Sequence, residues 1–137
     1  MTKADIERIV SVWQERLGLS HWDIKVRWEM PVSKGDDAEI RVHQDYEQAS
    51  MRIQQDTDPA STPPTVPFTT WTEKQANLVV VHELLHVFEK ETRRPAESLE
   101  DVLSSSSYTM FWSWYEHGAE NWVDRLAARI VEMGGVA

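Results

Sequence analysis

Residues 78–88 carry apolar side chains at helical spacing, and two histidines, His82 and His86, lie within this run four positions apart. Thr72 followed by Gln75 three residues later is the pattern of a capping box. Together these features predict a helix over residues 73–91. Because positions i and i+4 share one face of an α-helix, both imidazoles are expected to point at one site.

Glu83 follows His82 directly, which completes the pattern His-Glu-x-x-His. A helical residue next to a ligand is rotated by about 100° around the axis, too far for a comfortable third ligand. It is well placed, however, to act on a water bound to a metal held by the two histidines. Random placement would produce the pattern in roughly 0.02 of chains with this composition. We therefore predict that His82 and His86 bind zinc and that Glu83 is a general base.

The flanking segments predict an α+β domain. Helical spacing is found over 3–17, ended by Gly18, and again from Tyr108 to Gly134. Alternating polar and apolar residues predict strands at 23–30, 38–43 and 49–53, joined as an antiparallel meander. Pro95 is expected to separate the second helix from the third, and residues 104–107 to form a loop or a helix start. The sheet is therefore small, antiparallel or mixed, with about three strands.

Residues 55–71 have a different composition, with four prolines among serine, threonine and aspartate. This composition predicts a long irregular loop. Loops of this length in compact domains are uncommon, so the segment is either a cover over an active site or a surface excursion. We treat residues 1–137 as one domain that includes this loop.

Composition narrows the classes of function. The chain contains no cysteine, which limits any metal site to histidine and carboxylate ligands. A formal net charge of -9 argues against a nucleic-acid partner, because phosphate binding draws on clustered Lys and Arg. No stretch approaches the roughly 18 apolar residues of a membrane span. Since the first residues lack a secretory signal, we expect a cytoplasmic protein.

A catalytic zinc site needs a third protein ligand, and the last helix offers two glutamates. Glu120 is favoured because Asp124, four residues further on, could accept a hydrogen bond from the far nitrogen of a ligand histidine. Such a contact would fix the orientation of the ring. Glu116 is the alternative third ligand.

His82-Glu83-x-x-His86, followed one helix later by Glu120 and Asp124, resembles the gluzincin metallopeptidases. Among compact members the chain is similar to the ImmA/IrrE-type peptidases and the short zincin-like proteins of phages and prophages. The resemblance implies a compact zincin-like fold, bound Zn²⁺, and hydrolysis of a peptide or protein substrate. It also implies a phage-like origin inside a bacterial host.

Two further roles follow from peptide hydrolysis. The developing oxyanion needs a hydrogen-bonding or positive group, and Tyr108, Tyr115, His117 and His43 are candidates without a ranking. An extended substrate could pair with an edge strand, for which Ala49 to Ile53 is the candidate, the alternative being that this run is an interior strand of the meander. The alternative function is a zinc-binding regulatory or interaction protein with a zincin fold and little turnover.

Overall fold

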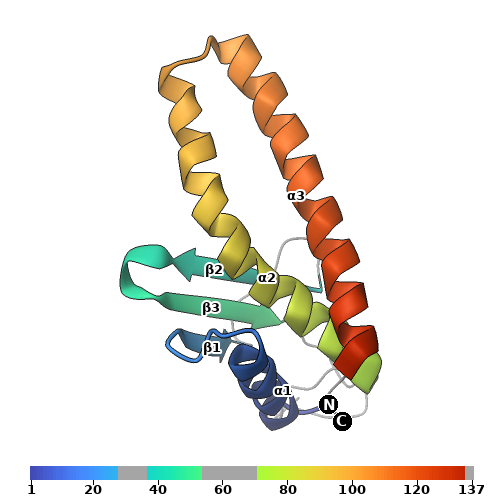
Figure 1. Ribbon diagram of the computed structural model, residues 1–137. Helices are drawn as coiled ribbons and strands as arrows, with labels where there is room; N and C mark the ends of the chain where they lie inside the picture. Colours follow the sequence, from blue (N-terminus) through green and yellow to red (C-terminus); the bar gives the residue numbers. More distant parts are fainter. Residues whose placement is uncertain (28–36, 54–70, 135–137) are drawn as a thin grey trace, which may run out of the picture.

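The computed structural model describes residues 1–27, 37–53 and 71–134, which form three helices and a three-stranded mixed sheet (Figure 1). The predicted α+β class is confirmed. The elements in chain order are α1 (Lys3–Arg16), β1 (Asp23–Arg27), β2 (Ala38–His43), η1 (Gln44–Tyr46), β3 (Gln48–Ile53), α2 (Glu73–Glu97), η2 (Ser98–Asp101) and α3 (Ser105–Gly134).

The helix starts follow the local sequence. The Thr72 hydroxyl accepts from the Gln75 backbone N–H, and the Gln75 side chain accepts from the Thr72 N–H at 2.9 Å, so α2 begins with the predicted capping box. Gly18 has a φ of 74° just after the C-cap of α1, where its lack of a Cβ permits the left-handed turn. Both boundaries are set by residues within one turn of the helix end.

One predicted helix boundary was wrong. Pro95 does not end α2, which continues to Glu97, because the proline lies in the last turn and only one backbone donor is lost there. Ser98 Oγ donates to the Pro95 carbonyl at 2.6 Å and helps to close this end. Residues 104–107 form a helix start, which is one of the two predicted alternatives: α3 begins at Ser105, and Ser104 Oγ accepts from the Ser107 N–H.

The sheet has the strand order β1-β3-β2, with β1 parallel and β2 antiparallel to β3. The predicted meander was therefore wrong, and Ala49–Ile53 lies in the central strand rather than at an edge. Alternation along a strand determines which side chains face the core but not which strands are neighbours. Residues 28–30 of the first predicted strand, and all of the predicted 55–71 loop except Trp71, lie outside the described residues.

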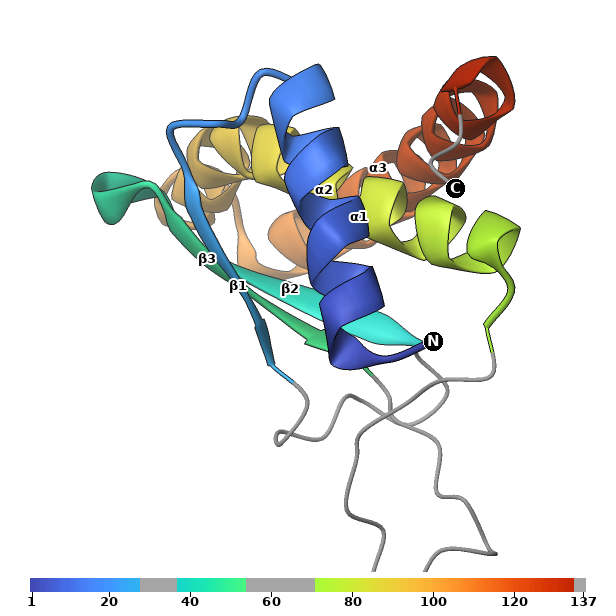
Figure 2. The same ribbon diagram turned by 90° about the horizontal axis from the view of Figure 1, so that it is seen from below.

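One face of the sheet packs against α1 and α2, as Figure 2 shows from below. Its buried apolar residues include Val26, Ala49 and Met51, whereas the intervening residues of β3 are only partly buried or exposed. The third helix packs on α2 instead, through a stripe at four-residue spacing made of Ala119, Val123, Ala127 and Val131. As a result α2 lies between the sheet and α3, and its two sides carry different contacts.

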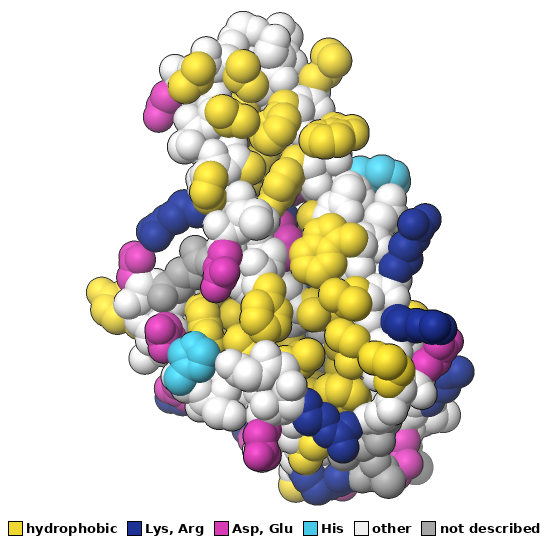
Figure 3. Space-filling model, viewed as in Figure 1, with side chains coloured by type: hydrophobic (Ala, Val, Ile, Leu, Met, Phe, Trp, Pro, Cys, Tyr) yellow, Lys and Arg dark blue, Asp and Glu magenta, His cyan; other side chains and the backbone are white. Residues whose placement is uncertain are grey.

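Helices α2 and α3 form a hairpin that projects beyond the sheet (Figure 1). Hydrophobic side chains gather over this projection (Figure 3), and Met110 and Trp114 are 77% and 73% exposed. Tyr108, Trp112 and Tyr115 stack in sequence along α3. The aromatic cluster is therefore an outer feature of the hairpin. None of the described helices has both the length and the apolar character that a membrane span requires.

Asn77 links α1 to α2 in the core. Its Oδ1 accepts from the Trp13 indole N–H at 2.6 Å, and its Nδ2 donates to the Glu73 carbonyl. We expect Asn77→Ala to lower the free energy of unfolding by about 1–3 kcal/mol, because the buried indole N–H loses this acceptor. Urea unfolding would measure the loss. Lys74→Ala, at an exposed position of the same helix, should change it by less than about 0.5 kcal/mol, and equal effects of both variants would contradict the assignment.

Candidate metal centre

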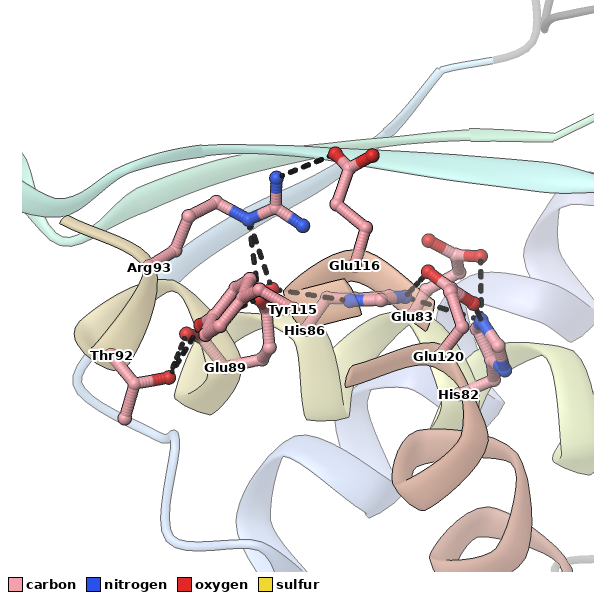
Figure 4. A network of polar contacts seen from close by, with 9 residues as sticks. All are labelled: His82, Glu83, His86, Glu89, Thr92, Arg93, Tyr115, Glu116 and Glu120. Atoms are coloured by element: carbon pink, nitrogen blue, oxygen red, sulfur yellow. Dashed lines mark hydrogen bonds and ion pairs between the residues drawn. The ribbon is translucent and has the colours of Figure 1, made fainter. Parts of the chain in front are cut away.

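Three side chains from two helices bring their donor atoms together (Figure 4). His82 Nε2 and His86 Nε2, both on α2, are 3.2 Å apart. Glu120 reaches over from α3 and places its carboxylate oxygens 3.4 Å from His82 Nε2 and 3.1 Å from His86 Nε2. Because of the i, i+4 spacing on α2 and the close packing of α3, the three side chains meet at one point.

The spacing of these donors fits a tetrahedral divalent cation. Zinc ligands lie about 2.0–2.2 Å from the ion, so two donors at tetrahedral positions are about 3.3–3.6 Å apart. The observed separations of 3.1–3.4 Å are close to this spacing. A carboxylate and two imidazole nitrogens are also a donor set that zinc accepts. The three residues could therefore hold a metal ion.

The far nitrogens of both rings are engaged by carboxylates. His82 Nδ1 lies 2.8 Å from Asp124 Oδ1, and His86 Nδ1 lies 3.5 Å from Glu89 Oε2. A ring that donates from Nδ1 presents an unprotonated Nε2, so the two Nε2 lone pairs face each other across the cluster. Two facing lone pairs beside a carboxylate repel one another unless a proton or a metal ion lies between them. The surroundings of the rings thus match the metal-binding tautomers.

Glu89 was missed by the sequence reasoning, which assigned an orienting carboxylate only to Asp124. A signal was available, since Glu89 is three residues after His86 within the apolar face of the helix and so lies beside it. Glu89 is 1% exposed. Burial raises the pKa of Glu89, but the hydrogen bond from His86 and the charge of Arg93 outweigh burial and hold the pKa below its ordinary value.

Glu83 lies beside the donor cluster without belonging to it. Its side chain is nearly buried, and Oε1 lies 3.9 Å from His82 Nε2. It lines both clefts that open at the cluster. This position suits a group that acts on a molecule bound at the cluster rather than a ligand.

Glu116, the alternative third ligand, lies outside the three-residue cluster. Its Oε1 accepts from Arg93 Nη1 at 3.3 Å, one helical turn before Glu120. The guanidinium therefore draws this carboxylate away from the two histidines.

The four oxyanion candidates occupy different places. Tyr115 donates to Glu89 Oε1 at 3.2 Å, and burial raises its pKa. Tyr108 lies in the first turn of α3, and exposed His117 contacts Asn121. His43 lines a separate cleft beside η1. Among the described residues, the walls of the two clefts at the cluster include none of the four.

No protein family model matches the chain, and no curated protein or solved structure matches it either. The resemblance to gluzincins therefore depends on the motif residues and on the spacing of Glu120 and Asp124. Function has to be inferred from the chemistry of the site.

Proposed function

We propose that this protein is a zinc-dependent endopeptidase of the gluzincin type. The observation that carries the proposal is the convergence of His82, His86 and Glu120 at a spacing that fits zinc, with Glu83 beside them. Two histidines and a carboxylate from a later helix supply three ligands, and the glutamate that follows the first histidine is not one of them. One position of a tetrahedral ion is then left for water or substrate. That open position separates a catalytic site from a closed structural one.

The residues divide the chemistry of amide hydrolysis between them. When bound, zinc would lower the pKa of water towards about 7 and polarise the scissile carbonyl. Glu83 would take a proton from the attacking water and deliver it to the leaving nitrogen. Asp124 would hold the His82 ring in the tautomer and orientation that the site requires.

Two clefts support a peptide substrate that extends on both sides of the scissile bond. Their volumes are about 410 and 600 Å³, and both are lined by Ala38, His82, Glu83 and Glu120. One continues past Leu78 and the other past Arg93. Within the described part of the chain, clefts thus extend from the cluster in two directions, which supports cleavage inside a peptide chain.

The edge strand beside this groove is β2 rather than the segment first predicted. Ala38 lines both clefts, and Glu39 and Ile40 line the second. Among the described strands β2 pairs only with β3, so it is an edge of the described sheet, and an edge strand could take up an extended peptide by backbone pairing. Backbone pairing of this kind tolerates varied side chains.

One observation favours a second candidate function, a metal that serves stability alone. Helix α3 packs mainly on α2, and its buried stripe consists of alanine and valine, which bury little apolar area. An ion shared by His82, His86 and Glu120 would fasten α3 to α2. A protein of this kind would bind zinc and partners without turnover.

The proposal predicts about one zinc ion per chain and hydrolysis of an unstructured protein such as casein. Metal analysis and gel or mass-spectrometric detection of fragments would measure both. Removal of the ion with a chelator should stop cleavage, and added zinc should restore it, because the position for the attacking water depends on the ion. Metal-loaded protein that melts at a higher temperature than the chelated form but cleaves nothing in a peptide library would favour the structural role.

A further inference from the structure

Glu89 lies three residues after the His-Glu-x-x-His motif, which does not require it, yet its side chain makes several contacts. The side chain is 1% exposed and receives three kinds of donor (Figure 4). His86 Nδ1 approaches Oε2 at 3.5 Å, Arg93 Nε donates at 3.1 Å, and Tyr115 OH donates at 3.2 Å. A buried carboxylate with this many donors is held in one position.

We infer that Glu89 is the positioning residue for His86 and that Tyr115 of α3 and Arg93 of α2 together hold Glu89 in place. The inference rests on the proposed metal centre. It gives His86 an orienting carboxylate, as Asp124 is for His82. It also connects the metal site to the aromatic part of the hairpin.

Arg93 is fixed from several directions. Its Nε contacts both carboxylate oxygens of Glu89, and its Nη1 donates to Glu116. The guanidinium carbon lies 5.1 Å from the centre of the Trp112 ring and 5.9 Å from that of Tyr115. Two cation–π contacts and two carboxylates leave the guanidinium little freedom to turn.

This arrangement gives the stacked aromatics of α3 a role in the site. Trp112 and Tyr115 are stacked with centroids 5.5 Å apart, and together they form the surface on which Arg93 rests. Arg93 in turn holds Glu89, and also binds Glu116, which would otherwise be free to compete with Glu120 for the ion. The two rings thus support Arg93, Arg93 holds Glu89, and Glu89 orients His86.

The test replaces Glu89 with glutamine and measures metal binding rather than cleavage. Co²⁺ serves as the probe, because its visible absorption reports the ligand geometry, and affinity is obtained by competition with a chelator. Glu89→Gln should lower Co²⁺ affinity about 10–100-fold and alter the absorption band. The reason is that the glutamine amide offers one acceptor oxygen, whereas the donors contact both oxygens of the Glu89 carboxylate. Glu91→Gln, at an exposed position on the same helix, is the matched control and should stay within about twofold.

A second variant keeps the test decisive if Glu89→Gln does not fold, as judged by circular dichroism. Tyr115→Phe retains the ring beneath Arg93 and removes only the hydroxyl donor, so Co²⁺ affinity should fall about two- to tenfold. Folded variants with wild-type affinity and spectrum would overturn the role of Glu89 while leaving the metal centre intact. Wild-type protein that binds neither Co²⁺ nor Zn²⁺ would instead defeat the proposed function itself.

Discussion

Glu83→Gln is expected to abolish proteolysis while leaving the bound metal in place. Glutamine matches the size of glutamate but cannot accept a proton from water at neutral pH. Loss of a general base typically costs about 10²–10⁴-fold in rate. Because Glu83 lies beside the donor cluster and not in it, metal content should not change. The ratio of the cleavage rates of variant and wild type, measured at equal metal content, gives the effect.

Glu91→Gln provides the control, since it makes the same chemical change on the same helix at an exposed position. It should cleave at the wild-type rate. If Glu83→Gln retains full activity, the assigned mechanism is wrong even when the metal site is intact. If Glu83→Gln loses the metal, the residue belongs to the ligand set and the division of roles proposed here fails.

Removing Glu120 should have the largest effect on metal binding of any single change outside the two histidines. The Glu120 carboxylate lies 3.1 Å and 3.4 Å from the two Nε2 atoms. We expect Glu120→Ala to reduce zinc affinity by more than the roughly 10–100-fold that loss of an outer contact costs. Chelator competition would measure the loss, and proteolysis should stop in parallel.

Glu116→Ala is the matched comparison, one turn earlier on the same helix. Its carboxylate is half exposed and paired with Arg93, and an exposed ion pair contributes about 0–1 kcal/mol. Zinc affinity should therefore change by no more than about fivefold. The opposite pattern, in which Glu116→Ala loses zinc and Glu120→Ala keeps it, would overturn the choice of third ligand.

The helices were predictable because their signals are local. The capping box at Thr72 and Gln75 defines where α2 begins, and apolar spacing within one turn defines the face that carries His82 and His86. Asp124 could be singled out in the same way, from its distance along α3 to Glu120. Each of these inferences needed only the geometry of a single helix.

Strand pairing and the partners of Glu89 could not be found in this way. Pairing of β1 with β3 depends on how the chain returns across the sheet, and alternation of side chains is the same for either neighbour. The donors to Glu89 include Tyr115, which is 26 residues away along the chain. Such contacts arise only when two helices dock.

By itself, the amino-acid sequence determined that α2 forms and that His82, Glu83 and His86 occupy neighbouring positions on it, because helix periodicity and capping act over a few residues. Only the tertiary structure decided which carboxylate meets the histidines. Docking of the alanine and valine stripe of α3 against α2 places Glu120 at the two Nε2 atoms, while Arg93 binds Glu116. That outcome depends on the packing of two helices, and packing is decided by the surfaces that meet rather than by spacing along either one.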